Sequence, residues 1–405
     1  MQKRITVLLL ILFFAIDLFA QNLSGVAERK TLDSVFVPEG NMLIDSNLLK
    51  KKSKLGLFIK KVLDGELNWN FVITPLAAYQ PETNWSFGMA GAYYLKSKKI
   101  GGRTGSIGFN ASYTLNKQFN FNILSTIYFD KNQKWFLYSN VGFKHYPDNF
   151  YGIGNHPDNL LSNSFSYNSD NFYFTAQPQM FFKGNWIAGI NLALRWENAF
   201  AGTNNLLGKT AMIEYSIKGF EKYFMLGYGG VLSYDSRDNL FYPNKGIFFK
   251  GVVTDYKQIF GSSYQMVKAQ VDFRQYIPLY KEFILAWQFF TEWTFADEKP
   301  FQMLSTIGGL EMLRGVRLKM WNDDVSAVVQ AELRIPVYSI FKAAVFAGIG
   351  DVYNLSSWQF AKPKIAYGIG LRVKFNKSKA HIRFDAARQN YDNSFSYYIT
   401  VNEAF

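Results

Sequence analysis

The sequence predicts an all-β fold, a membrane-spanning antiparallel β-barrel with apolar residues facing out and polar residues facing in. Three observations predict it: an N-terminal export signal, a high aromatic content, and strand-length runs with a period of two. The 405-residue chain contains 25 Tyr, 39 Phe and 9 Trp. No apolar run of about 18 residues follows residue 21, so a bundle of transmembrane helices is excluded.

The chain begins with MQKRITVLLLILFFAIDLFAQ, in which two basic residues precede an apolar run from Ile5 to Ile16. This order is typical of a secretory signal peptide, and the run is too short to span a membrane. We therefore expect residues 1–20 to be a signal peptide, although Leu18 is larger than the residues usual before a cleavage site. Because the chain has no cysteine, disulfides and an acylated N-terminal cysteine are excluded.

The formal net charge of +13 would by itself suit nucleic acid or an anionic surface. An exported protein does not normally meet nucleic acid, so we expect no such partner. We expect the bacterial outer membrane as the location and its lipids as the surroundings. No metal or other cofactor is expected.

Residues 21–66 form a separate polar segment in which LLKKKSKLGLFIKKVL (48–63) could be a short basic amphipathic helix. A solvated periplasmic segment is favoured over a plug or a membrane-surface helix. From residue 67 the sequence changes to runs near the roughly 9–11 residues with which a tilted strand crosses a bilayer. We therefore predict that residues 67–405 are the barrel.

The alternation is sharpest toward the C-terminus. In VSAVVQAELRI (325–335), apolar residues occupy the odd positions, and the even positions include Ser326, Gln330, Glu332 and Arg334. A soluble sandwich would also alternate, but the signal peptide, the aromatic content and the strand lengths favour an apolar outer face. Closure follows because an open sheet edge cannot lie in lipid.

The predicted strand count is 16, at about 21 residues for each strand with its connection. This count requires residues 198–222 to be one outer loop. The stretch KTAMIEYSI (209–217) within that loop could instead be a further strand.

The seam between the first and last strands carries two marked residues. Pro75 removes a ladder donor from the predicted first strand, and proline is expected on edge strands or at bulges. Two interpretations remain open for it: a seam weakened for strand addition, or a bulge without function. The last strand ends on Phe405, which would share its outward face with Tyr397 and Ile399. Glu403 on that same face departs from the pattern.

Several stretches together resemble the BamA/TamA superfamily of outer-membrane assembly and translocation barrels, also called bacterial surface antigen barrels. They are YDSRDNLFYPNKG (234–246), GGLEMLRGVR (308–317), AELRIPVY (331–338), FAGIGDVY (346–353), IRFDAAR (382–388) and NEAF (402–405). YPDNFYGIGN (146–155) is similar to members with few accessory domains. The resemblance covers most of residues 67–405 in order.

The resemblance implies that the sixth outer loop, here about 295–324, folds back into the lumen. In that family the arginine of an Arg-Gly-Phe/Tyr tip pairs with acidic residues on the inner wall. Arg314, Gly315 and Val316 occupy the tip here, and Glu332 matches one acidic wall position. An Arg–carboxylate pair in a confined lumen would be strong, and removing one partner would leave the other stranded.

Two positions depart from the family's site. Val316 replaces the aromatic residue, and Gly348 stands where a second acidic residue is usual. Asp351 lies in the opposite phase, so we expect the loop to dock with one acidic partner fewer. Glu292, which alternation places inward, is a candidate substitute. Arg317 has no assigned partner.

The resemblance further implies a role in outer-membrane biogenesis or in protein or lipid translocation. Residues 21–66 are too short for one of the periplasmic POTRA modules of the family. An accessory subunit that works with other outer-membrane or periplasmic assembly proteins is therefore one expectation. A transport channel or structural barrel without insertase activity is the alternative.

An enzyme is not expected. The chain has three histidines, His145, His156 and His381, and no Gly-x-Ser-x-Gly elbow. Hydrolysis of a phospholipid or peptide reporter by the purified protein would contradict this expectation.

Overall fold

The computed structural model describes most of the chain from residue 71 onward: residues 71–81, 83–95, 105–155, 164–201, 217–239, 242–338, 341–356, 362–374, 381–391, 395–401 and 403–405. The predicted signal peptide (1–20) and periplasmic segment (21–66) lie outside these residues. Among the described residues, no helix has the length and apolar character needed to cross a membrane. The helical elements of this described part are two short 3-10 turns, η1 (Gln258–Phe260) and η2 (Phe301–Met303).

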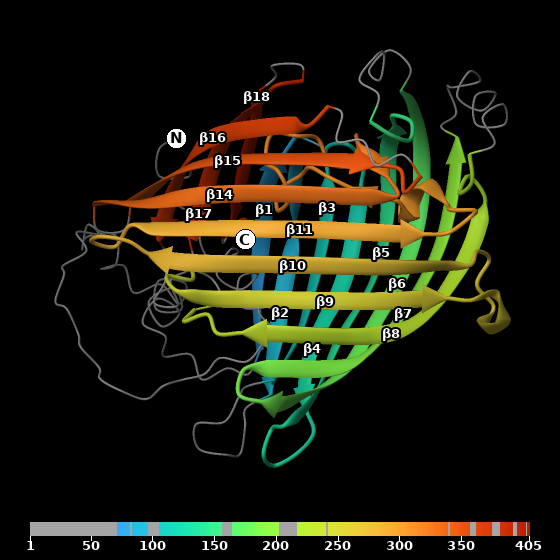
Figure 1. The fold of residues 1–405 in the computed structure, drawn as a ribbon, viewed down its shortest axis with the longest axis horizontal. Coiled ribbons are helices and arrows are strands. Elements are labelled where there is room, and N and C mark those ends of the chain that lie inside the picture. Colours follow the sequence, from blue (N-terminus) through green and yellow to red (C-terminus); the bar gives the residue numbers. More distant parts are fainter. Residues whose placement is uncertain are drawn as a thin grey trace, which may run out of the picture.

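Sixteen strands close into one antiparallel barrel, in which each strand pairs with its chain neighbours and β1 meets β18 (Figure 1). The first eight are β1 (Phe71–Gln80), β2 (Asn84–Leu95), β3 (Gly105–Thr114), β4 (Phe119–Tyr128), β5 (Trp135–Phe150), β6 (Phe165–Lys183), β7 (Trp186–Ala201) and β8 (Lys222–Asp235). The others are β9 (Gly246–Tyr256), β10 (Met266–Pro278), β11 (Ile284–Phe295), β14 (Val325–Tyr338), β15 (Phe341–Tyr353), β16 (Lys364–Lys374), β17 (His381–Gln389) and β18 (Phe395–Val401). The predicted 16-stranded barrel is therefore confirmed.

Two very short strands, β12 (Ser305–Thr306) and β13 (Asn322–Asp323), pair with each other and are not part of the barrel wall. They lie within residues 296–324, which connect β11 to β14 and which we call the docking loop. The predicted bounds of this loop, about 295–324, agree with the observed strand ends.

The predicted outer loop at 198–222 is shorter than expected, because β7 continues to Ala201. β7 pairs directly with β8 from Trp186–Tyr234 to Asn198–Lys222. The segment between them therefore inserts no strand into the barrel wall, which resolves the uncertainty in the strand count.

The barrel has two unlike ends. Strand β1 begins and strand β18 ends at the same end, on the left in Figure 1, which we call the terminal end. The opposite end, on the right, carries residues 151–155, 217–221 and 296–324 and is called the loop end.

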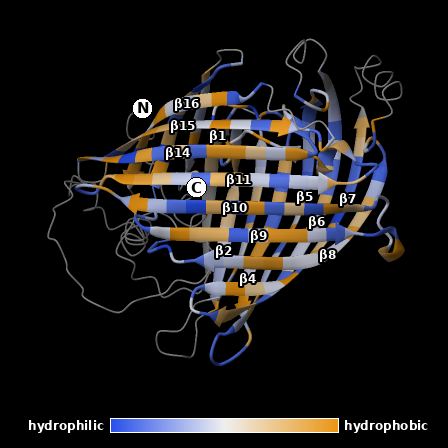
Figure 2. Ribbon diagram, in the orientation of Figure 1, coloured by the Kyte–Doolittle hydropathy of each residue, from blue (hydrophilic) through white to orange (hydrophobic). Residues whose placement is uncertain are grey.

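Figure 2 shows hydrophobic and hydrophilic residues mixed along each strand, and the exposed fractions of the side chains show that the apolar ones face outward. On β16 the side chains of Ile369 and Tyr367 are 65% and 51% exposed, whereas Arg372 is fully buried. Apolar side chains on the exposed face and charges inside are the arrangement that hydrocarbon surroundings require.

On β5 to β8 the limit of this apolar face is visible in the register. One row of directly opposed outward residues is aromatic: Phe143, Phe172, Trp196 and Phe224. Two residues nearer the loop end, the next outward row is polar: His145, Asp170, Asn198 and Lys222. Aromatic girdles mark membrane interfaces, so this change places the interface between the two rows. His145 bonds to Asp170 at 2.6 Å in the polar row.

Ile369→Arg should destabilise the barrel in lipid vesicles by about 2–4 kcal/mol, because it places a charge on the lipid face in the middle of β16. The free energy of unfolding in urea measures this effect. Asn122→Arg, on the half-exposed inward face of β4, is the matched control and should change stability little. Equal losses for both variants would contradict the assignment of the two faces.

Candidate functional site: the docking loop and its charge cluster

The docking loop lies inside the barrel. Its apolar residues Leu313, Val316 and Trp321 are at most 1% exposed. They belong to one core cluster with Phe290 of β11, Val328 of β14, Val352 of β15 and Ala366 of β16. These three residues therefore pack against the inner faces of four neighbouring strands. Those faces can be reached only from within the lumen.

Arg314 at the loop tip pairs with carboxylates from two strands. One guanidinium nitrogen, Nη2, lies 2.7 Å from Glu332 Oε2 of β14, and Nη1 lies 2.8 Å from Asp385 Oδ2 of β17. The guanidinium carbon of Arg314, Cζ, lies over the ring of Phe346, 3.6 Å from the ring centroid. Arg314 is 1% exposed, so these two ion pairs and the ring replace the water that would otherwise solvate its charge.

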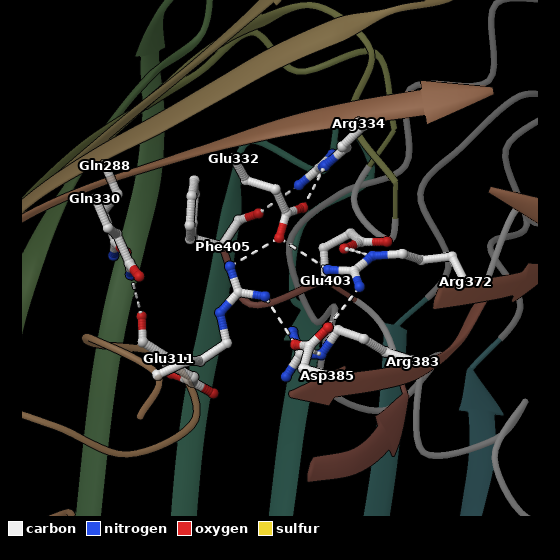
Figure 3. Close-up of polar contacts among 11 residues, drawn as sticks. Gln288, Glu311, Gln330, Glu332, Arg334, Arg372, Arg383, Asp385, Glu403 and Phe405 are labelled. Atoms are coloured by element: carbon white, nitrogen blue, oxygen red, sulfur yellow. Dashed lines mark hydrogen bonds and ion pairs between the residues drawn. The ribbon is translucent and has the colours of Figure 1, made fainter. Parts of the chain in front are cut away.

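Three further arginines complete a buried charge cluster (Figure 3). Arg372 of β16 reaches Glu332 at 2.8 Å, Asp385 at 2.5 Å and Glu403 at 3.1 Å. Arg334 of β14 binds the second oxygen of Glu332 at 2.9 Å, and Arg383 lies 3.1 Å from Asp385. We call these seven residues the docking cluster: Arg314, Arg334, Arg372, Arg383, Glu332, Asp385 and Glu403.

The cluster unites parts of the chain that are distant in sequence. Arg334 also donates to the main-chain oxygens of Pro243, in the β8–β9 connection, and of Phe405, each at 3.0 Å. Tyr242, beside Pro243, lies under the Arg334 guanidinium at 4.9 Å from the ring centroid. Burial raises the pKa of the Tyr242 hydroxyl above its usual range, so the group stays neutral there.

The loop tip fits closely because two glycines, one in the tip and one on the wall, make room for it. Gly315 has φ of +107° and donates its N–H to the Tyr398 hydroxyl at 3.0 Å. Glycine adopts this left-handed conformation without a steric penalty. A side chain at Gly348 would bring its Cβ within 2.8 Å of Leu313 Cδ1, so the position expected to be acidic is instead a recess for Leu313.

Not every predicted partner is in the cluster. The structure brings Arg314 and Glu332 together, but Glu292 bonds to Lys268 of β10 at 2.9 Å, so its prediction as the substitute partner is wrong. The second carboxylate comes from Asp385, which lies in the IRFDAAR stretch but was not predicted to pair with Arg314. The side chain of Val316 packs in the apolar core of the loop, and Arg317 lies over the Tyr151 ring at 5.5 Å.

A second clamp holds the loop near the loop end. The N–H of Gly154 donates to the Asn322 oxygen at 2.8 Å, and the Asn322 amide donates to the Gly152 oxygen at 3.2 Å. Asp351 accepts from Asn155 at 2.6 Å and from Lys364 at 3.1 Å. The YGIGN stretch therefore fastens the returning limb of the loop, and Asp351 serves this clamp and not Arg314.

The seam differs from every other strand boundary. β1 and β18 are in register at one described pair, Tyr79 with Ile399, whereas β17 and β18 pair from Ile382–Val401 to Arg388–Phe395. Pro75 lies within β1 opposite Met89 of β2, and no described β18 residue is paired with it.

The last residues of the sequence are not where the alternation predicted them. Strand β18 ends at Val401, and Phe405 is 4% exposed inside the barrel, in a cluster with Ala404, Tyr276 of β10 and Ala286 of β11. The prediction that Phe405 and Glu403 lie on the outer face of the last strand is therefore wrong. A carboxylate is more stable beside Arg372 than facing lipid, which gives the physical reason.

The other residues considered for chemistry are separate from the cluster or at its edge. His145 faces outward in the polar row, and the His381 ring lies 4.3 Å from the Tyr242 ring, whereas His156 lies outside the described residues. In the part of the chain that the structure describes, no group of three or more His, Cys, Asp or Glu side chains could hold a metal.

Arg314→Ala should release the docking loop and reduce the free energy of unfolding by on the order of 3 kcal/mol, because it leaves two buried carboxylates with one donor fewer. Limited proteolysis should then cut within residues 296–324. Arg317→Ala, three residues away and outside the cluster, is the control and should leave the loop resistant. A loop that stays resistant in both Arg314→Ala and Glu332→Ala would show that the cluster does not hold it.

Solved structures of low sequence identity share this fold. BamA from Haemophilus ducreyi lacking POTRA domains 1–3 is 14% identical, with a TM-score of 0.59 over 83% of this chain and 70% of that chain. CdiB from Acinetobacter baumannii is 12% identical, with a TM-score of 0.51 over 82% and 59%. CdiB from Escherichia coli is 10% identical, with a TM-score of 0.54 over 83% and 63%. The chain thus spans about six-tenths of the two CdiB chains.

No curated protein sequence is a detectable relative of the chain. The family model of the Omp85 superfamily domain, however, matches residues 99–405, which include most of the barrel and the whole docking cluster. Both the fold and this match agree with the resemblance carried by the sequence motifs, and the chain belongs to the Omp85 superfamily.

Proposed function

We propose that this barrel acts in outer-membrane biogenesis or translocation and that it adds an extended client strand to the exposed edge of β1. Membership of the Omp85 superfamily implies the bacterial outer membrane as its location. Likeness to BamA and CdiB at 10–14% identity supports the fold alone, so the proposed action depends on the seam.

The observation that carries the proposal is the incomplete pairing of β1. Residues from Phe71 to Gln80 pair with β2 along their whole length, but among the described residues Tyr79 alone is in register with β18. The other edge of β1 therefore presents main-chain N–H and C=O groups toward the seam. Unpaired edge groups are costly in lipid and are satisfied when another strand is added.

Pro75 fits this proposal. Proline cannot donate to a ladder, so it limits how well any strand completes the β1 edge at that point. A strand added there would be held less firmly than in the rest of the barrel, which suits a client that must later leave. The interpretation of Pro75 as a bulge without function predicts instead that the seam never opens.

The proposal includes other outer-membrane or periplasmic assembly proteins as partners of the barrel, which would make it an accessory subunit. Isolation from native membranes as a lone monomer would count against this part. The proposal involves no cofactor and no catalytic step.

A disulfide across the seam should abolish the function if β1 must open. Tyr79→Cys with Ile399→Cys joins the one registered pair, and the chain contributes no competing cysteine. In cells depleted of the native protein, the oxidised lock should lower the amounts of other outer-membrane barrels, and a reductant should restore them. Val329→Cys with Ile349→Cys, an opposed outward pair between β14 and β15, is the matched control.

Normal amounts of the other barrels with the seam locked would contradict strand addition at β1. Normal amounts after complete depletion of the protein would contradict a role in biogenesis altogether.

One observation favours the alternative, a transport channel without insertase activity. The inward faces of β3 to β5 carry half-exposed amides, Asn110, Asn120, Asn122 and Asn140, in contrast to the buried docking cluster across the lumen. Asn120 donates to Asn110 at 2.9 Å, so the amides form part of a polar wall that water reaches.

Conductance across a planar bilayer separates the two functions. If the docked loop closes the lumen, the native protein should conduct little and Arg314→Ala should open large pores. Large, stable pores of equal size in the native protein and in Arg314→Ala would support the channel and argue against a loop that gates it.

A further inference from the structure

The connection between β9 and β10 carries the most exposed large apolar side chain in the described part of the chain. Ile259 in η1 is 83% exposed, and Phe260 beside it is 51% exposed. Residues 258–265, QIFGSSYQ, contain no charged side chain. η1 is the short coiled ribbon at the right edge of Figure 1, at the loop end of the barrel. Apolar side chains that gather on a surface mark contact with lipid or with another protein.

Two serines fasten this connection to β8, so η1 is presented in one orientation. The Ser262 hydroxyl donates to the Leu226 oxygen at 2.9 Å and accepts from the Leu226 N–H at 2.8 Å. The Ser263 N–H donates to the Phe224 oxygen at 2.7 Å, and the Phe224 N–H donates to the Ser263 hydroxyl at 3.0 Å. These bonds satisfy the edge of β8 beyond Gly227, where its pairing with β9 ends. Lipid can therefore surround this edge without leaving its main-chain groups unpaired.

The main chain of the turn forms hydrogen bonds within itself. The Phe260 N–H donates to the Lys257 oxygen at 3.1 Å, and the Gly261 N–H donates to the Gln258 oxygen at 2.8 Å. Gly261 has φ of +90°, which reverses the chain directly after η1. Internal bonds of this kind lower the cost of bringing a turn into the boundary between headgroups and acyl chains.

Phe260 folds back onto the lipid face of the barrel. Its ring meets the Tyr228 ring edge to face, with 5.4 Å between the centroids. Tyr228 points outward from β8 and lies four residues nearer the terminal end than Phe224 of the aromatic row. At a rise of about 3.3 Å per residue and a strand tilt of about 40°, that separation corresponds to about 10 Å of depth. Phe260 therefore contacts a side chain whose strand position lies below the membrane interface.

A charged pair lies on the same part of the outer face. Asp255 of β9 stands opposite Tyr228, accepts from its hydroxyl at 3.4 Å and lies 3.4 Å from Lys257 Nζ. A carboxylate at this level is tolerated when it is paired, and these two groups supply the pairing. The long Lys257 side chain can reach the headgroups while Ile259 and Phe260 lie among acyl chains, as in other interfacial segments.

On its inner side the connection is fixed by Tyr264. This residue belongs to one core cluster with Met303 of the docking loop, and its hydroxyl donates to Glu221 at 2.7 Å. The connection therefore joins the lipid face of the barrel to the core around the docking loop.

We propose that η1 is a membrane anchor whose Ile259 and Phe260 side chains insert into the acyl chains of the outer leaflet. The longer connections of bacterial barrels lie outside the cell, which assigns the loop end to that leaflet. The anchor continues the lipid-facing surface of Leu226, Tyr228 and Val253, so lipid is favoured as its partner over a second protein. It fixes the depth of β8 to β10 in the bilayer. This inference concerns attachment to lipid and does not depend on strand addition at β1.

Site-directed fluorescence in nanodiscs tests the anchor, because the chain has no cysteine of its own. Ile259→Cys and Phe260→Cys are each labelled with bimane in nanodiscs of phosphatidylethanolamine and phosphatidylglycerol, which leave both sides of the bilayer accessible. Ser356→Cys, at an exposed position in the β15–β16 connection of the same end, is the matched control. Lipids that carry a spin label high on the acyl chain and iodide in the buffer are the two quenchers.

The labels at Ile259 and Phe260 should emit at shorter wavelength than the label at Ser356. They should lose most of their emission to the spin-labelled lipid and little to iodide, whereas the label at Ser356 should show the reverse. The Phe260→Cys variant gives a second reading if Ile259→Cys disturbs the turn.

Two results would overturn the anchor. One is quenching of both turn labels by iodide to the same extent as the label at Ser356. The other is shielding of both labels from both quenchers, which would show that protein covers the turn. Neither result bears on the seam-lock experiment in cells, because no client is present in the nanodiscs.

Discussion

The interior of this barrel depends on the ion pairs between Arg314 and two wall carboxylates, Glu332 and Asp385. A buried charge is tolerated only when it is paired and hydrogen-bonded. The pairs made by the tip arginine therefore fix how deeply the docking loop enters the lumen. Arg372 and Arg334 then extend the same network to Glu403 and Phe405 and to the β8–β9 connection. Removing any one charge therefore affects segments that do not touch it directly.

The cluster also explains why the two sides of the lumen differ. The loop fills the side lined by β11 and β14 to β18, where charged residues are buried and pair with one another. The side lined by β3 to β5 carries neutral amides that water reaches, because no described part of the loop covers them. The same alternation of polar and apolar residues produces both sides, and the docking loop buries the side chains of the first side only. A role in biogenesis would use the side that the docked loop fills, whereas conduction would use the half-exposed side lined by β3 to β5.

Much of the fold could be predicted because its physical causes are local. The requirement for an apolar outer face appears in the sequence as an alternation, and the loop ends appear where that alternation stops. Placing Glu332 inward needed only the phase of β14. Its pairing with Arg314 came from the family resemblance, since no spacing rule connects a loop tip to a strand. Asp385 was inward by phase but unassigned, because its distance from Arg314 depends on how β17 stands beside β16 in a closed barrel.

The two wrong predictions share a different cause. Glu292 was assigned to Arg314 by phase alone, but Lys268 on the neighbouring strand is closer, and register decides that pairing. Phe405 and Glu403 are predicted to face outward because the alternation with a period of two does not itself show where the strand ends. The chain ends the pattern where it would put a carboxylate into lipid. Glu403 in the outward phase was thus a sign that the strand stops before it, and the same carboxylate then finds Arg372 in the lumen.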